Sequence, residues 1–190
     1  MATEYDDPGQ YRQRVVAESI RLFAEQGYEA TTVDDVAAAT GTSRRTLYRQ
    51  FGSKEGLIFA DHESLLTVVA DQLERSDDDP WSAVCTGAEL VFAHFAANAD
   101  LAARRYEVVS QVPALRDREL VMASRYQRLF EDYLRGRCPD ASRARIVAYA
   151  AAVTGVHNYL LRQMSRGDVA ATAQALDAEL RRLQRTVADR

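Results

Sequence analysis

The sequence has few cysteines and prolines, and it has no long hydrophobic run. The two cysteines, Cys85 and Cys138, are too few for a disulfide framework or a cysteine-based metal site. The longest uninterrupted apolar run, residues 146–153, is far shorter than the ~20 residues that a helix needs to cross a bilayer. The first residues are acidic and lack the apolar stretch of a signal peptide. We therefore expect a cytoplasmic protein with no membrane partner and no metal.

Charge of one sign does not dominate the chain. Its 24 basic and 28 acidic residues give a net charge of −4, which argues against a protein that is basic over its whole surface. Nucleic-acid binding depends on local charge, so the balance does not exclude it. Because 47% of the residues are hydrophobic, the chain has enough apolar material to form a core, and full disorder is excluded.

Only four prolines interrupt the chain, and none lies between residues 9 and 79 or after residue 139. Long proline-free stretches with apolar residues every three or four positions predict helices, and no strand-like alternation of any length occurs. We expect an all-α fold of about nine helices. They cover residues 10–26, 33–40, 44–51, 54–75, 81–97, 99–111, 114–135, 142–166 and 169–188. The polar stretch 76–80 is the clearest break between an N-terminal headpiece and a larger body.

The strongest local pattern spans residues 32–54, where two short helices flank a turn at Gly41. Thr32 followed by Asp35 predicts a capping box at the start of the first helix, and Ser43 can cap the second. Small and apolar residues allow the two helices to pack closely, which is the specification of a helix-turn-helix. The expected contact residues are Val33, Val36 and Ala37 on the first helix and Leu47 and Phe51 on the second.

The exposed side of the second short helix is basic. From Val36 to Lys54 the chain carries four positive charges and no acid. The start of a recognition helix points at base edges, so Arg44, Arg45 and Thr46 are expected to contact bases and the others phosphates. Lys54, the only lysine, is expected at the start of the fourth helix as a phosphate-binding cation. The alternative is a solvated basic face. The candidate DNA-contacting residues are Thr32, Thr42, Ser43, Arg44, Arg45, Thr46, Tyr48, Arg49 and Lys54.

The segment from Arg12 to Leu57 resembles the N-terminal domain of TetR/AcrR-family transcriptional regulators. The matching pieces are LFAEQGYEATTV (residues 22–33), VA (36–37), GTS (41–43), TLYRQF (46–51) and SKEGL (53–57). Gln50 departs from the family, which often has an aromatic residue there. The resemblance covers about a quarter of the chain. It implies a nine-helix homodimer that binds a palindromic double-stranded DNA operator, usually as a repressor released by a small ligand.

With this resemblance we divide the chain into a flexible N-terminus (residues 1–9), a helix-turn-helix DNA-binding domain (10–56) and a ligand-binding and dimerisation domain (57–190). In the last helix, apolar residues recur from Val169 to Val187 at alternating steps of four and three, which is the pattern of a heptad seam. The alternative is that this stripe packs within one protomer. The expected dimer interface comprises Ala151, Gly155, Leu176, Leu180, Leu183 and Val187.

A ligand pocket in the body requires aromatic or polar residues on otherwise apolar helix faces. Each such residue alone is more often an ordinary core residue. A small hydrophobic or amphiphilic effector is the expected ligand. The candidate pocket residues are Trp81, Phe92, His94, Tyr106, Met122, Tyr126, Phe130 and His157.

The sequence offers no sign of an enzyme or of a bound cofactor. It has no glycine-rich phosphate loop, no paired His and Cys ligands and no nucleophile elbow. We therefore expect a homodimeric repressor that a small molecule releases from its operator. The alternatives are an activator or a ligand-independent regulator of the same fold, or an all-α interaction protein that uses the headpiece only as a scaffold.

Overall fold

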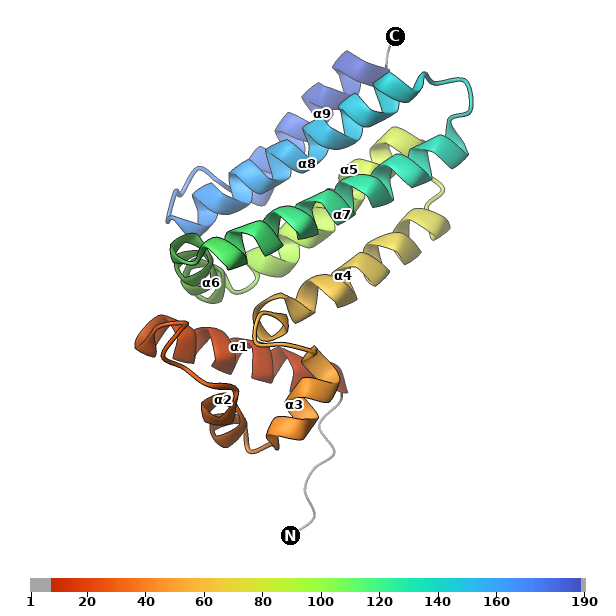
Figure 1. Ribbon diagram of the computed structural model, residues 1–190. Helices are drawn as coiled ribbons and strands as arrows, with labels where there is room; N and C mark the ends of the chain where they lie inside the picture. Colours follow the sequence, from red (N-terminus) through yellow and green to blue (C-terminus); the bar gives the residue numbers. More distant parts are fainter. Residues whose placement is uncertain (1–7, 189–190) are drawn as a thin grey trace.

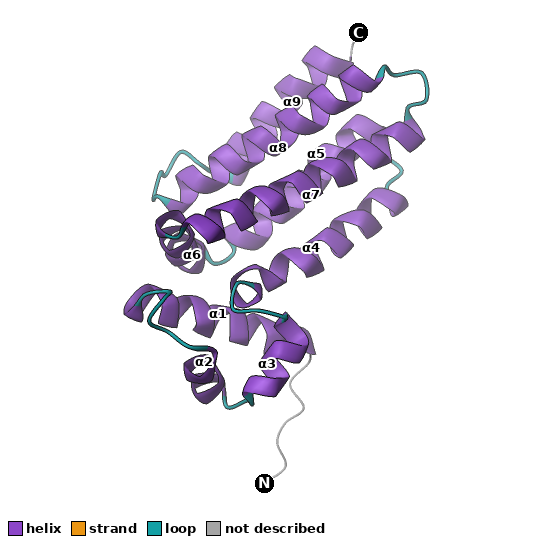
Figure 2. Cartoon of the chain, viewed as in Figure 1, coloured by secondary structure: helices purple, strands orange, loops and turns teal. Residues whose placement is uncertain are grey.

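A computed structural model of the chain describes residues 8–188. Within this range the protein is built from nine helices and contains no strand, which confirms the all-α prediction (Figure 2). No helix in the described part of the chain is long and apolar enough to cross a membrane. The helices are α1 (Pro8–Gln26), α2 (Val33–Thr40), α3 (Arg44–Phe51), α4 (Gly56–Arg75), α5 (Pro80–Ala96), α6 (Ala99–Gln111), α7 (Pro113–Arg137), α8 (Arg143–Ser165) and α9 (Ala173–Ala188).

Helices α1–α3 form a headpiece at one end of the molecule, and α4 leads from it into a helical bundle (Figure 1). In the bundle α5 lies in the middle and contacts α4, α8 and α9, while α7 packs against α8. The short helix α6 lies at the junction and contacts both α1 and α8. The headpiece therefore meets the body mainly along α4 and α6.

Two hydrophobic cores divide α4 between them. The first turns of α4, residues 57–60, belong to the headpiece core, whereas Leu65, Val69 and Leu73 belong to the core of the bundle. The headpiece core also includes Met122 of α7 and buried residues of α6. Because apolar packing continues from the headpiece into the body, the headpiece core extends beyond residues 10–56.

Three helices begin two or more residues away from their expected starts. The first helix begins at Pro8, so residues 8 and 9 are helical, and residues 1–7 lie outside the described part. Helix α4 begins at Gly56 rather than at Lys54. A Cβ atom at Gly56 would lie 1.9 Å from the carbonyl oxygen of Phe51, so the tight turn into α4 requires glycine at this position.

The last helix begins at Ala173 rather than at Val169. Thr172 caps it, since its hydroxyl oxygen accepts a hydrogen bond of 3.2 Å from the backbone N–H of Ala175. Residues 168–172 form a turn in which Asp168 accepts from the N–H of Ala170 at 2.9 Å. Val169 is 92% exposed and takes no part in the expected seam. The boundary therefore depends on two hydrogen bonds between a side chain and the backbone, made by Thr172 and Asp168, which apolar spacing does not reveal.

Candidate DNA-binding surface and ligand cavity

Side chains cap both helices of the helix-turn-helix. Thr32 and Asp35 form the predicted capping box, with hydrogen bonds of 2.7 Å from the N–H of Thr32 and 3.2 Å from the N–H of Asp35. Ser43 caps α3, and its hydroxyl oxygen accepts a hydrogen bond of 3.1 Å from the N–H of Thr46. Between the helices Gly41 adopts a left-handed conformation with φ of 65°. The predicted turn and both predicted caps are confirmed.

The predicted contact between the two helices also forms. All five expected contact residues on α2 and α3 are buried in the headpiece core. Thr42, in the turn, accepts a hydrogen bond of 3.1 Å from the hydroxyl group of Tyr11 on α1. Helix α3 is therefore held along one side by packing and at its start by capping, which leaves its other side free.

The free side of α3 carries the predicted basic residues. Arg44, Arg45 and Arg49 are exposed, and Tyr48 is 42% exposed. Arg44 forms an ion pair of 3.0 Å with Asp34 of α2, and its guanidinium lies 5.5 Å from the ring centre of Tyr48. The charge count that began at Val36 missed this acid by two residues. Arg45 and Arg49 are thus more available for DNA than Arg44.

Lys54 occupies a different environment from the expected one. Its ammonium donates a hydrogen bond to the carbonyl oxygen of Tyr28 and lies 4.2 Å from the centre of the Tyr28 ring. The hydroxyl group of Tyr28 in turn donates to Glu55 at 3.2 Å, and burial raises the pKa of this tyrosine. Lys54 therefore ties the turn after α1 to the start of α4. Its contact with DNA remains a prediction, but its expected place on the first turn of α4 is wrong.

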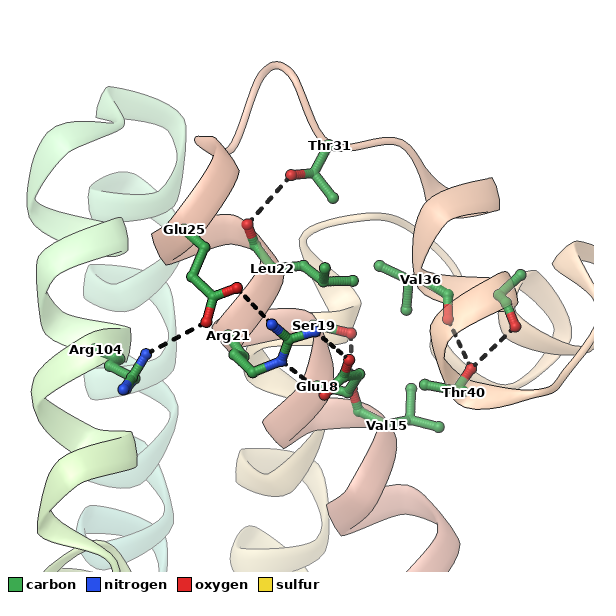
Figure 3. A network of polar contacts seen from close by, with 11 residues as sticks. Val15, Glu18, Ser19, Arg21, Leu22, Glu25, Thr31, Val36, Thr40 and Arg104 are labelled. Carbon is green, nitrogen blue, oxygen red and sulfur yellow. Dashed lines mark hydrogen bonds and ion pairs between the residues drawn. The ribbon is translucent and has the colours of Figure 1, made fainter.

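An ion-pair network joins the headpiece to the body (Figure 3). On α1, Arg21 pairs with Glu18 at 2.6 Å and also with Glu25. Glu25 reaches Arg104 of α6 at 3.9 Å. The network lies where α1 packs against α6, so a movement of α6 would displace α1 and with it the headpiece.

A cavity of about 110 Å³ lies in the body next to this junction. Its walls come from α4, α5, α6, α7 and α8, and most of them are apolar or aromatic. Four of the candidate pocket residues line it: Tyr106, Met122, Tyr126 and His157. Lining residues that sequence analysis missed include Phe59, His62, Arg105 and Asn158.

The other four candidates lie elsewhere. Trp81 packs edge-on against Tyr149 at 4.9 Å, outside the cavity lining. Phe92 is buried in the core of the bundle. His94 lines a separate cleft between α1 and the body, and Phe130 lines a small cavity that adjoins the main one. Their apolar surroundings suit a core as well as a pocket, so spacing could not separate the two.

An ion pair lies between the cavity and the cleft beside α1, since Arg105 lines both and Asp61 lines only the cleft. Arg105 on α6 pairs with Asp61 on α4. Burial would raise the pKa of Asp61, but Arg105 and His94 outweigh it and hold the pKa below its ordinary value. Arg105 could have been noticed in the sequence, because it lies on the apolar face of its helix between Ala102 and Val109.

The histidines, which are far apart in the sequence, gather around this region. The rings of His62 and His94 both lie 5.1 Å from that of Phe95. Burial lowers the pKa of both His62 and His157 to about 4, so both are neutral at pH 7. The described residues include no group of three His, Cys, Asp or Glu side chains placed to hold a metal ion.

The expected dimer interface is corrected at two positions. Leu176 and Leu180 are 0% exposed within one protomer, where they pack in the core of the bundle. Leu183 is half-buried against the same core, and the side chain of Val187 lies outside the described part. The stripe on α9 thus packs inside the protomer over these residues, because α5 and α8 cover it.

The other two expected interface residues lie on the surface of α8. Ala151 and Gly155 are both exposed, and a Cβ atom added at Gly155 would meet nothing within 4 Å. On the same helix Tyr159, a large aromatic side chain, is 57% exposed. This side of α8 is therefore a free surface of small residues next to an exposed aromatic ring.

Comparison with known proteins gives one family. Residues 15–60 match the model of "Bacterial regulatory proteins, tetR family". The chain is 44% identical over 55 residues to the HTH-type transcriptional repressor AcnR of Corynebacterium glutamicum. The aligned region covers 29% of each protein. Curated relatives are matched over 23–39% of their own length, so this similarity concerns the headpiece and its surroundings.

Similarity to solved structures extends over nearly the whole chain. The TetR-family regulator PfmR of Thermus thermophilus is 25% identical, with a TM-score of 0.55 over 90% of this chain and 97% of that one. FadR of Thermus thermophilus, a TetR-family repressor solved with lauroyl-CoA, is 19% identical with a TM-score of 0.57 over 90% and 92% of the two chains. The second likeness concerns the fold alone. The body thus has the same fold as such regulators.

Proposed function

Since the chain is a TetR-family regulator by its headpiece and its fold, we propose that it is a homodimeric transcriptional repressor that a small molecule releases from a palindromic operator. The observation that carries this proposal is helix α3. It is capped by Ser43, packed on one side and basic on the other. An exposed basic helix after a tight turn has the geometry that enters the major groove of DNA.

Within this proposal some residues on α3 contact bases and others contact phosphates. We expect Arg45, which is exposed in the first turn of α3, to donate two hydrogen bonds to a guanine, and Arg49 and Tyr48, one turn later, to contact phosphates. Arg44 must first leave Asp34, which costs little because the pair is exposed. We therefore assign sequence readout first to Arg45.

Two copies of α3 must reach major grooves about 34–36 Å apart, or a multiple of that spacing. We propose the exposed side of α8 as the dimer contact, since Ala151 and Gly155 permit close approach and Tyr159 offers apolar area.

We propose that the DNA-binding domain ends at residue 56 and that the rest of α4 belongs to the body. Because the proposed partner is DNA, we also propose that the protein is cytoplasmic.

The cavity supplies a physical route for release. Phe59 on α4 and Val109 on α6 line it, and both belong to the headpiece core. A ligand that presses on these residues would move α4 and α6, the two helices on which the headpiece rests. A ligand that binds better to a state with mismatched α3 spacing shifts the population away from DNA.

Selection of bound sequences from a random pool of duplex DNA tests the proposal. We expect a palindrome, and Arg45→Ala should weaken its binding with the loss concentrated at one base pair in each half-site. A bidentate arginine–guanine pair gives roughly 1–3 kcal/mol of discrimination, which is about ten- to a hundredfold per half-site. Arg49→Ala is the control, since a lost phosphate contact should weaken all sequences alike. An unchanged base preference in Arg45→Ala would remove this arginine from readout.

The sign of regulation depends on where the operator lies relative to a promoter, so an activator of the same fold would give the same selection result. A transcription assay on the selected operator with and without the protein separates the two. Failure to enrich any DNA sequence would instead favour the all-α interaction protein.

A further inference from the structure

Two side chains that line the cavity have buried polar atoms without a hydrogen-bond partner among the described residues. The side chain of Arg105 is 9% exposed, and its Nε and Nη1 atoms have no hydrogen-bond partner among the described residues, since the third nitrogen alone meets Asp61. His157 is 7% exposed, and its Nδ1–H donates to the amide oxygen of Asn158 at 3.2 Å, so its Nε2 atom, which has no partner among the described residues, is an acceptor. Both residues line the cavity. Because a buried donor without an acceptor is costly, the free N–H groups of Arg105 require an oxygen atom from a ligand or from water.

The charges around the cavity are already balanced. The positive charge of Arg105 is compensated by Asp61, and at the cavity rim Arg162 lies 3.9 Å from Glu119. His157 is neutral at pH 7. An ionic ligand would therefore bring an uncompensated charge into a buried site, which is strongly unfavourable. What Arg105 lacks is a further hydrogen-bond acceptor, not a counter-ion.

The remaining walls are apolar, and aromatic rings are prominent among them: Phe59, Phe95, Tyr106 and Tyr126. A dry cavity of about 150 Å³ lined by apolar side chains accepts benzene. The present cavity, of about 110 Å³, is of similar size and holds an apolar group no larger than one ring.

We propose that the effector is an uncharged, largely apolar molecule that places a carbonyl-type oxygen against Arg105. This inference rests on the proposed function, because it names the ligand class for the same cavity. The oxygen accepts from the free N–H groups of Arg105, while the apolar part fills the space between the aromatic rings. The bound molecule would touch Arg105 on α6 and Phe59 on α4, the two helices that carry the headpiece.

Four probes that share one benzene ring and differ at the polar end test this class: acetophenone, ethylbenzene, benzoate and benzylammonium. Their affinities are measured by calorimetry on the full chain at pH 7.5, without DNA. We expect acetophenone to bind at least about tenfold more tightly than ethylbenzene, because a hydrogen bond from a charged donor contributes at least that factor. Both charged probes should bind at least about tenfold more weakly than acetophenone.

The variant Arg105→Lys keeps a positive charge beside Asp61 but lacks the planar donor group. It should reduce the preference for acetophenone over ethylbenzene to less than about threefold, with the affinity for ethylbenzene unchanged. Arg104→Lys is the matched control on the same helix, since Arg104 faces Glu25 instead of the cavity, and all four affinities should stay the same. A second measurement needs no variant: the carbonyl stretching frequency of acetophenone bound to the wild-type protein should fall below its value in hexane.

Three results would overturn the proposal. If benzoate binds at least as tightly as acetophenone, the cavity is an anion site. If acetophenone and ethylbenzene bind equally, or the carbonyl frequency does not fall, Arg105 makes no bond to the ligand. If no probe binds, the cavity does not take this class. Operator binding by the ligand-free protein is measured separately, so a failure here leaves the test of DNA binding intact.

Discussion

Mild acid should destabilise this protein, because burial keeps His157 neutral. The pKa of His157 is lowered to about 4 in the folded state, whereas in the unfolded chain it returns to about 6.5. Between these values the unfolded chain binds a proton that the folded protein does not. By linkage, the free energy of unfolding is fully retained above about pH 6.5 and falls as the pH drops towards 4.

The size of the effect follows from the two pKa values. At pH 5 the pH lies about 1.5 units below the pKa of the histidine in the unfolded chain, while the folded histidine is still mostly neutral. At 1.36 kcal/mol per unit, protonation stabilises the unfolded chain by about 2 kcal/mol. His62, whose pKa is also lowered to about 4 by burial, adds at most the same amount, and less in practice because it lies against the cavity and is not fully enclosed. A loss of about 2–4 kcal/mol is a large part of the roughly 5–15 kcal/mol that stabilises a typical domain.

Nearby ionisable groups also affect how the free energy of unfolding changes with pH. The pKa of Asp61, which faces His62 together with Arg105, is lowered in the folded state, so its stabilising effect is lost only at pH values below the histidine range. Burial raises the pKa of Glu119, so its folded form takes up a proton first and slightly offsets the loss as the pH falls. The region between pH 7.5 and 5 therefore reports mainly on the buried histidines.

Urea unfolding followed by circular dichroism at pH 7.5, 6 and 5, at one fixed protein concentration, measures this effect. The ring centres of His157 and Phe92 lie 6.1 Å apart. The variant His157→Phe keeps a flat ring at this position, but the new ring cannot titrate. It should lose about 2 kcal/mol less than the wild type between pH 7.5 and 5. Equal stability of the wild type at the two pH values would show that water reaches the histidine and would refute the burial argument.

The dimer contact and the protomer core give opposite expectations for two nearby helices: Gly155→Arg should yield a folded monomer by analytical ultracentrifugation, because the position is exposed and unobstructed, and an intact dimer would place the interface elsewhere. Leu180→Ala should instead destabilise the protomer by about 2–5 kcal/mol in urea unfolding, since its side chain is fully buried, and a change in association without loss of stability would contradict this. Lys54→Met should lower headpiece stability by about 1 kcal/mol through the lost bond to Tyr28. If Lys54 also contacts a phosphate, as its sequence context predicts, the slope of log affinity against log salt should fall by about 0.9 in this variant, and an unchanged slope would contradict the contact.

Local chemistry in the sequence determined most of the headpiece. Thr32 with Asp35, Ser43 and Gly41 specify caps and a turn within a few residues of chain, so their roles follow without knowledge of the fold. The amphipathic spacing that buries Leu47 and exposes Arg45 is equally local. The helix-turn-helix and the basic face of α3 were therefore predictable from the sequence.

Tertiary structure decided what each face meets. The apolar stripe of α9 is real, but periodicity states only that Leu180 must be covered, and the structure shows that α5 and α8 of the same protomer cover it. Lys54 is likewise drawn inward by Tyr28, which precedes it by 26 residues. The cavity depends on contacts at still longer range, since Asp61, Arg105 and His157 come from α4, α6 and α8. These groups become buried and paired only when helices that are far apart in the sequence pack together. A sequence pattern describes neighbours along the chain and gives no spatial distance between such helices.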